Sequence, residues 1–275
     1  MAIGDRESAR PRGESAPDFS VFGRTPRFGL LEEQRVLDAV AALQAQRTRI
    51  ASALVRGRSP GAVLLGIGIV DINHRLFEES QRWQSLLSTR PRGRVEELRV
   101  SMPINRRIVV DGMRMVSVFD LDSTTPEARL LLSGERAMRY HFALAPLQMK
   151  LVDGRQVLLA GPVIGGEPTV MAVDKPACLA AAMAYWKAVL ATAFPAVELR
   201  TPVPDATDRQ RQVIALLSTG VHDGQIASAL GISVRTVRTE VAVLMDRFGV
   251  GSRFALGRVV QEQLRGGSGA VPERA

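Results

Sequence analysis

The segment 207–264 is divided by glycines and helix-capping residues into short amphipathic stretches, and this punctuation restricts the fold more than any other feature of the chain. The first stretch begins at a threonine, a good helix N-cap, and ends at Gly220. The second, 223–230, is followed by Gly231-Ile232-Ser233, in which the glycine suits a left-handed helix end and the serine caps the next helix. The pattern predicts an all-α domain of four short helices, with a three-residue turn between the second and third.

The third stretch, 234–248, predicts a helix with one apolar stripe, which consists of Val237, Val241, Leu244 and Phe248. At 100° per residue the opposite face is basic and polar near its start, as in helices that enter the DNA major groove. Residues at the helix start suit phosphate contacts, helped by the helix dipole, and arginine and threonine can hydrogen-bond base edges. We therefore predict DNA contacts from Ser233, Arg235, Thr236, Arg238, Thr239 and Ala242.

The same segment resembles the LuxR-type, GerE-like helix-turn-helix domain of bacterial transcriptional regulators. The shared elements occur in order: Thr207, Arg209, Arg211, Gly220, Ile226-Ala227, Leu230-Gly231-Ile232-Ser233, Thr236-Val237-Arg238, Gly249-Val250 and Ser252-Arg253. This resemblance implies that Arg238 and Thr239 reach bases and that a final helix, 252–264, serves dimerisation. It also implies double-stranded promoter DNA as a partner, a homodimer, and RNA polymerase as a further partner.

The charge of the chain is consistent with a polyanionic partner. Lys plus Arg number 36 against 28 for Asp plus Glu, a formal net charge of +8. The one cysteine, Cys178, excludes an intrachain disulfide and a cysteine-based zinc cluster, which favours a reducing compartment. The first residues carry charge, proline and glycine where a signal peptide needs an apolar run. We expect a cytoplasmic, nucleoid-associated protein without a membrane segment.

The N-terminal part of the chain begins with a tail, 1–28, that is too polar to fold by itself. It is followed by one long amphipathic helix, 29–57, whose apolar seam consists of Val36, Val40, Leu43, Ile50 and Leu54 and is interrupted at Arg47. The seam leaves two interpretations open, a dimerising coiled coil or a helix packed on the following domain. A second tail, 266–275, ends the chain.

Between residues 62 and 196 the sequence alternates strand-like and helix-like stretches, which predicts an α/β domain. We expect strands at 63–70, 97–102, 114–119, 140–144 and 169–173, and helices at 71–87 and 178–193. Two apolar runs around Asp153-Gly154 predict a β-hairpin. The segment 197–206, with two prolines after Arg200, is expected to be an extended, exposed linker to the helical domain at 207–265.

The order of these parts is similar to that of actinobacterial LuxR-family regulators in which a TrmB-type winged helix precedes a phospholipase D-like regulatory domain. The winged helix is not evident here. The phospholipase D motif, a histidine followed two residues later by lysine, is also missing, because none of the three histidines, His74, His141 and His222, has that neighbour. We therefore predict no catalytic residues, no cofactor, no metal site and no enzymatic activity.

Other chemically suggestive residues have ordinary structural interpretations. Gly66 and Gly68 lack the third glycine of a phosphate-binding loop and suit a closely packed strand end. Asp120 and Asp122 suit a solvated turn, and Cys178 suits a small buried apolar position. The sequence thus predicts a DNA-binding transcriptional regulator whose α/β domain senses a ligand or a partner or mediates assembly. The alternatives are a helix-turn-helix that binds protein and an enzyme domain tethered to DNA.

Overall fold

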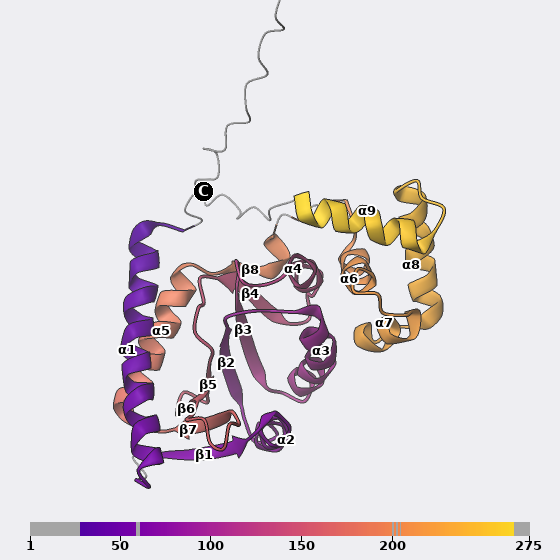
Figure 1. Ribbon diagram of the computed structural model, residues 1–275. Coiled ribbons are helices and arrows are strands. Elements are labelled where there is room, and N and C mark those ends of the chain that lie inside the picture. The colour runs from indigo at the N-terminus through magenta and orange to yellow at the C-terminus, as the bar shows by residue number, and fades with distance from the viewer. Residues whose placement is uncertain (1–27, 59–60, 200, 202, 204, 267–275) are drawn as a thin grey trace, which may run out of the picture.

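The computed structural model describes residues 28–58, 61–199, 201, 203 and 205–266. Nearly all of the two predicted tails, 1–28 and 266–275, lies outside these residues. The described chain forms an α/β part built on one sheet and a helical C-terminal part that packs against one side of it (Figure 1). The α/β part accounts for α1 to α5 and all the strands.

The sheet of the described residues has eight strands in the order β1-β7-β6-β5-β2-β3-β4-β8. Only the central strands β2, β3 and β4 run parallel to one another, and the other neighbours are antiparallel. The strands are β1 (Ala62–Ile67), β2 (Ser85–Arg90), β3 (Arg114–Asp120), β4 (Arg139–Ala143), β5 (Met149–Val152), β6 (Gln156–Ala160), β7 (Thr169–Val173) and β8 (Phe194–Pro195).

Helices cover both faces of this sheet, so alternate residues of the central strands enter two separate cores. On one face α1 (Leu30–Val55) and α5 (Pro176–Ala191) enclose a core that includes Val118, Met149 and Leu151. On the other face α2 (Ile69–Ser80), α3 (Val95–Val110) and α4 (Pro126–Ser133) contribute to a core with Phe119 and Phe142. This second core continues into the helical part of the chain.

The apolar seam of α1 is covered by the chain's own α5. Val36, Leu43 and Ile50 are buried in the same core as α5 residues such as Tyr185. Arg47, which interrupts the seam, donates from Nε to the carbonyl oxygen of Ala160 at 2.7 Å. Of the two interpretations left open by the sequence, the structure therefore has the helix packed on the α/β domain.

Two expected elements of the α/β part are wrong. The predicted helix 71–87 ends at Ser80, and its last residues belong to β2. This strand lies in the middle of the sheet with both faces covered, so it lacks the alternating pattern of a half-exposed strand. The predicted strand 97–102 is part of α3, whose buried residues Val95, Leu98 and Met102 follow helical spacing.

The hairpin expected at Asp153-Gly154 is present and joins β5 to β6. Asp153 and Gly154 both have positive φ, 52° and 66°, which asparagine, aspartate and glycine tolerate best. Val152 pairs with Gln156, so the loop consists of Asp153, Gly154 and Arg155. The Asp153 carboxylate also accepts from the backbone N–H groups of Gln84 and Ser85 at 3.0 and 2.7 Å. The turn therefore fixes the start of β2 as well as the hairpin.

Candidate nucleic-acid interface

The C-terminal part contains four consecutive helices: α6 (Asp208–Leu217), α7 (Asp223–Leu230), α8 (Val234–Arg247) and α9 (Arg253–Gly266). The first begins with a reciprocal capping box. Thr207 Oγ1 accepts from the backbone N–H of Gln210 at 3.2 Å, and the Gln210 side-chain oxygen accepts from the Thr207 N–H at 3.1 Å. The backbone N–H groups of Thr207 and Gln210 would otherwise lack an acceptor at the helix end, so the capping box defines where α6 starts.

The turn between α7 and α8 has the conformation expected from the sequence. Gly231 ends α7 with φ +67° and ψ 36°, a left-handed conformation that a side chain would strain. Ser233 then caps α8, since its Oγ accepts from the Thr236 N–H at 3.0 Å. The Ser233 and Thr236 hydroxyls also contact each other at 2.8 Å. These contacts set the direction in which α8 leaves the turn.

The six predicted DNA-contacting residues lie together at the start and along the outer face of α8. Val237, Val241 and Leu244 are buried on the opposite side. Thr236 is half-buried, whereas the other five, Ser233, Arg235, Arg238, Thr239 and Ala242, are exposed. The helix thus presents a basic and polar surface to solvent at its N-terminal half, the half that helix-turn-helix proteins direct at base edges.

Arg238 is exposed but has an acidic partner. Its Nε lies 3.4 Å from the Asp223 carboxylate at the start of α7, and its side chain is 74% exposed. Arg253 forms a closer ion pair with the same carboxylate and also donates to the Val221 carbonyl oxygen at 2.8 Å. Burial alone would raise the pKa of Asp223, but the two arginines outweigh it and hold that pKa below its usual value. The carboxylate therefore stays neutralised by Arg253 when Arg238 turns away.

Glu240 is the one acidic residue next to the base-reading positions, and the sequence did not indicate which way it points. It is only 18% exposed and faces α6, where it accepts from Gln210 Nε2 at 3.3 Å and lies 3.8 Å from Arg209. Its negative charge is therefore held on the inner side of α8. The exposed face keeps its positive character.

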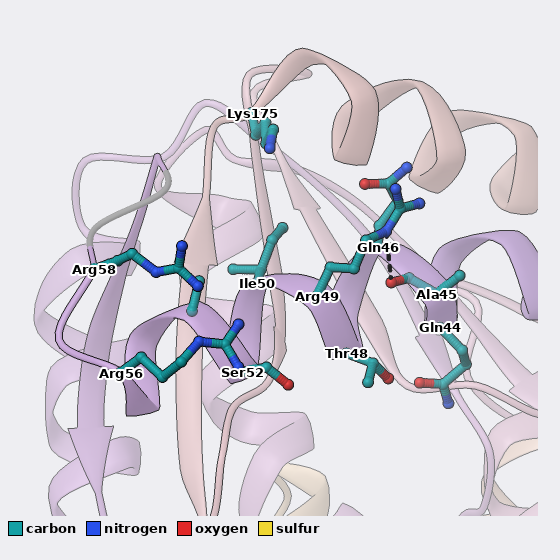
Figure 2. A pocket seen from close by; sticks show the side chains of 11 residues that line it. Gln44, Ala45, Gln46, Thr48, Arg49, Ile50, Ser52, Arg56, Arg58 and Lys175 are labelled. Atoms are coloured by element: carbon teal, nitrogen blue, oxygen red, sulfur yellow. Dashed lines mark hydrogen bonds between the residues drawn. The ribbon is translucent and has the colours of Figure 1, made fainter.

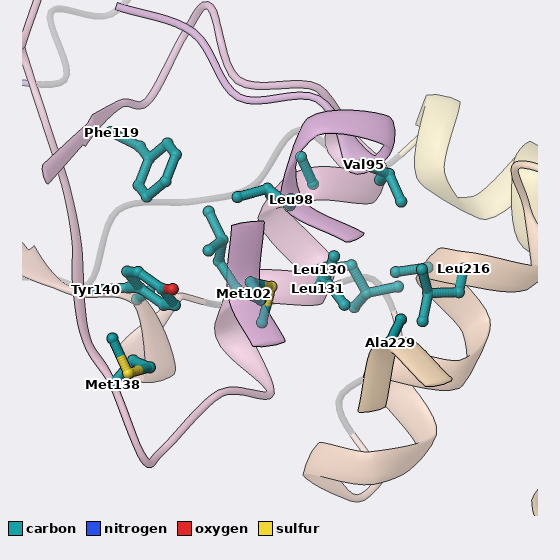
Figure 3. Close-up of a cluster of buried hydrophobic side chains, with 14 of the residues drawn as sticks. Val95, Leu98, Met102, Phe119, Leu130, Leu131, Met138, Tyr140, Leu216 and Ala229 are labelled. Carbon is teal, nitrogen blue, oxygen red and sulfur yellow. The ribbon is translucent and has the colours of Figure 1, made fainter. Parts of the chain in front are cut away.

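The reading face of α8 points away from the α/β part. In Figure 1, α8 lies at the outer edge of the molecule, with α6 and α7 between it and the helices α3 and α4. The apolar core passes across this junction. Figure 3 shows Leu130 and Leu131 of α4 beside Leu216 of α6, with Ala229 of α7 close to them. The two parts therefore pack together without covering the candidate DNA-binding face.

Polar contacts reinforce the junction. Arg106 of α3 donates from Nε to Glu135 at 2.8 Å and from Nη1 to the Ala229 carbonyl oxygen of α7 at 2.9 Å. Glu135 is only 5% exposed, so this is a nearly buried ion pair. Arg136 pairs with Asp208 at the start of α6. Sequence patterns gave no signal for these contacts, because the partners are distant in the chain.

The connection between the two parts differs from the expected exposed linker. Its described residues Leu199, Val203 and Ala206 are buried in the core that joins the α/β and helical parts. The two prolines of this segment suggested exposure, but the apolar side chains of Leu199, Val203 and Ala206 fill the junction. The connection therefore adds to the contact between the parts.

Other sequence candidates have structural roles. Asp120 does not lie in a solvated turn as predicted, because it is buried at the end of β3. Its carboxylate accepts from the backbone N–H groups of Ser123 and Ala145 at 3.0 and 2.9 Å, so it secures the loops after β3 and β4. A Cβ added at Gly66 would lie 3.0 Å from the backbone of Ile72, which explains the glycine by close packing. Within the described residues there is no group of three or more His, Cys, Asp or Glu side chains that could hold a metal ion.

A second basic region lies beside the C-terminal half of α1 (Figure 2). Exposed Arg49, Arg56, Arg58 and Lys175 surround an open depression of about 1020 Å³. In Figure 1, α1 and α8 lie at opposite edges of the molecule. These cations therefore belong to a different surface from the face of α8.

Comparison with known proteins identifies the helical part. Residues 206–260 match the sequence profile of the family described as "Bacterial regulatory proteins, luxR family". The C-terminal domain is a LuxR-type domain. The Bialaphos biosynthetic pathway regulatory protein of Streptomyces hygroscopicus is 45% identical over 53 residues, which are 19% of this chain and 21% of that protein. The similarity thus spans about a fifth of the curated relative and is confined to one region.

Among solved structures, NucT from Helicobacter pylori matches with a TM-score of 0.39 and 10% identity, over 49% of this chain and 98% of that chain.

In the described part of the chain, no helix is both long and apolar enough to span a membrane.

Proposed function

We propose that the protein is a sequence-specific DNA-binding transcriptional regulator and that α8 is its reading helix. The observation that carries this proposal is the exposed basic and polar face of α8 within the LuxR-type domain. Arg238 and Thr239 would reach base edges, while Ser233, Arg235 and Thr236 would contact phosphates. Ala242 is small enough to let the helix approach the groove closely. The mechanism is binding rather than catalysis.

The free protein holds Arg238 near Asp223, and DNA would compete for it. An exposed ion pair of this kind contributes little stability, so exchanging it for a guanine edge is favourable. Asp223 would keep Arg253 as its partner. We propose a homodimer that presents two copies of α8 to successive half-sites at promoters, where RNA polymerase is the neighbouring partner.

We further propose two functional units, a LuxR-type reader at 207–265 and an α/β domain at 62–196 that responds to a ligand or a partner. The support is the junction itself: α3 and α4 of the α/β domain hold α6 and α7 of the reader through Arg106, Glu135 and Arg136. A change in the position of α3 or α4 would therefore change how α8 is presented. DNA binding is therefore the property that a ligand or partner of the α/β domain would change.

The experiment selects a preferred duplex from a randomised pool with the full-length protein and then measures the affinity of Arg238→Ala for it. We expect a loss of about 1–3 kcal/mol on the selected duplex and relaxed preference at one base position. Arg49→Ala is the matched control, because Arg49 is an exposed arginine of α1, at the opposite edge of the molecule from α8 (Figure 1). Equal losses on all duplexes would make Arg238 a phosphate contact, and no selectable duplex would contradict the proposal.

A further inference from the structure

Two cations of the α/β domain lack any acidic partner. Lys150 of β5 and Arg90 at the end of β2 are partly buried, and neither forms a hydrogen bond or ion pair with any described residue. The partly buried Arg106, by contrast, has Glu135. Withdrawing a charge from water without a partner is unfavourable, so two such charges in one place call for a ligand that neutralises them.

The two side chains lie on the same face of the sheet. Ser88 of β2 is paired with Lys150 across the β2–β5 ladder, and Arg90 follows Ser88 by two residues. Side chains two residues apart in a strand point to the same side, so Lys150 and Arg90 are diagonal neighbours, about 7–8 Å apart at their Cα atoms. Across the next two strands, Ser88 pairs with Ser117 of β3, and Ser117 pairs with Tyr140 of β4. The side chains of Ser117 and Tyr140 therefore lie on the same face of the sheet as Lys150 and Arg90.

The surroundings supply hydrogen-bonding groups but little negative charge. The buried hydroxyls of Ser88 and Ser117 lie 2.8 Å apart and bond to each other. The guanidinium of Arg90 lies 5.5 Å from the centre of the Phe119 ring, which attracts a cation but does not neutralise it. Glu97 of α3, an exposed residue, attracts Arg90 without forming an ion pair with it.

The electrostatics agree with this geometry. Burial, and to a smaller extent the positive charge of Arg90, lower the pKa of Lys150 to about 8. Burial likewise lowers the pKa of the Arg90 guanidinium. With a pKa of about 8, Lys150 remains mostly protonated at neutral pH. Arginine side chains keep their charge in proteins, so the site carries two positive charges there.

The position of Arg90 in the sheet corresponds to the usual position of ligand sites in α/β proteins. Arg90 is the last residue of β2, one of the two strands that flank β3 in the parallel part of the sheet. In α/β sheets, ligands bind beyond the carboxyl ends of parallel strands, because the loops there leave a crevice. Both cations are partly exposed, so a small ion can reach them.

We propose that Arg90 and Lys150 bind the phosphate group of a small molecule, with the Ser88 and Ser117 hydroxyls beside it. A phosphate monoester carries about −1.5 to −2 charge at neutral pH, which matches the two cations, whereas a carboxylate would leave one of them unpaired. Arginine can grip two phosphate oxygens at once, and lysine adds a point charge. The inference deepens the proposed responsive role of the α/β domain and rests on it for its regulatory meaning.

A continuous set of contacts leads from this site to the reader. Tyr140, which lies on the same face of the sheet, accepts a hydrogen bond from Asn105 of α3 at 3.2 Å. The next residue, Arg106, donates to the Ala229 carbonyl oxygen of α7. Figure 3 shows Tyr140 and Phe119 in the same cluster of side chains as Met102 of α3. A ligand that contacts Tyr140 would thus act on the helix that holds the LuxR-type domain.

The test measures binding of inorganic phosphate and of glycerol 3-phosphate to the full-length protein, by calorimetry and thermal unfolding at constant ionic strength near pH 7. We expect saturable binding, weakened about tenfold or more in Lys150→Met and in Arg90→Gln. Arg49→Gln, which changes an exposed arginine of α1, should bind like the wild type. Stronger binding of the ester than of inorganic phosphate would identify a phosphorylated metabolite, and equal binding would identify free phosphate.

The proposal is overturned if the wild type shows no saturable binding of either compound, or if Lys150→Met and Arg90→Gln bind as tightly as the wild type. Lys150→Met is expected to fold, because it keeps the apolar stem and removes an unpaired charge. Melting of this variant well below the wild type in phosphate-free buffer would reveal a structural partner of Lys150 and would also overturn the proposal. No DNA is present, so failure here is distinct from failure of the proposed DNA-binding function.

Discussion

The cations of α8 and those of the sheet carry the same charge in different surroundings. Arg235 and Arg238 lie on an exposed helix face, where water solvates them. Arg238 also has the Asp223 carboxylate as an ion-pair partner. Arg90 and Lys150 are partly withdrawn from water and have no acidic partner among the described residues. Exposed cations can attract a polyanion at almost no cost in stability, whereas half-buried ones destabilise the fold until a ligand neutralises them. The cations of this chain, whose net charge is +8, thus occur in two different electrostatic environments.

The largest expected effect concerns the junction that links these two regions. Glu135→Ala leaves the partly buried Arg106 without its carboxylate partner, which should lower the free energy of unfolding by about 3 kcal/mol. The measurement is urea unfolding of the full-length protein. Because a buried pair can be replaced by apolar side chains, Glu135→Leu combined with Arg106→Met should recover most of the loss. A loss below about 0.5 kcal/mol in Glu135→Ala would mean that the pair does not hold the junction.

A second prediction concerns Lys150 and pH. Its pKa is about 8 in the folded protein against 10.5 as the ordinary value, so the unfolded chain binds more protons between those two pH values. Wild-type stability should therefore gain a rising contribution with pH in that window. Lys150→Met lacks this contribution and should be more stable than the wild type near pH 7, by up to about 3 kcal/mol, with the difference vanishing above pH 10.5.

The measurement for this prediction is the difference in unfolding free energy between Lys150→Met and the wild type from pH 7 to pH 10.5, in phosphate-free buffer. Lys175→Met is the matched control, because Lys175 is an exposed lysine of the same α/β part. A difference that does not change with pH would contradict the account of Lys150.

A smaller effect is expected at the start of the reading helix. Ser233→Ala removes the hydroxyl that caps α8, which should lower stability by about 1 kcal/mol. The same hydroxyl is a proposed phosphate contact, so the variant should bind all duplexes more weakly. Ser233→Asp keeps a cap but repels phosphate, and it should therefore retain stability while losing DNA affinity. Recovery of both properties in Ser233→Asp would show that Ser233 acts only as a cap.

The two regions also differ in how far the sequence predicts them. The LuxR-type domain depends on local signals: the caps at Thr207 and Ser233 and the left-handed Gly231 each act within a few residues, so the bounds of α7 follow from the sequence. The exposed face of α8 follows from the same periodicity. The prediction that its residues contact DNA stays a prediction.

In the α/β domain the decisive contacts are long-range. The position of β2 depends on pairing with β3 and β5, which no local pattern indicates. Arg90 and Lys150 belong to different strands, 60 positions apart by their numbers, and become neighbours only in the sheet. The hairpin at Asp153-Gly154 could be predicted because its signal lies in two adjacent residues.

The most direct test of the central claim is the salt dependence of DNA binding by the full-length protein and by Arg235→Gln/Arg238→Gln. The control is Arg49→Gln/Arg56→Gln, in the basic depression beside α1. The account predicts that the affinity of the wild type falls steeply with salt. The slope of log K against log salt should decrease by about 1 in the α8 variant, because Arg235 is its phosphate contact, and the control should keep the wild-type slope. A slope that changes in the control but not in the α8 variant, or no DNA binding at all, would contradict the assignment of α8 as the reading helix.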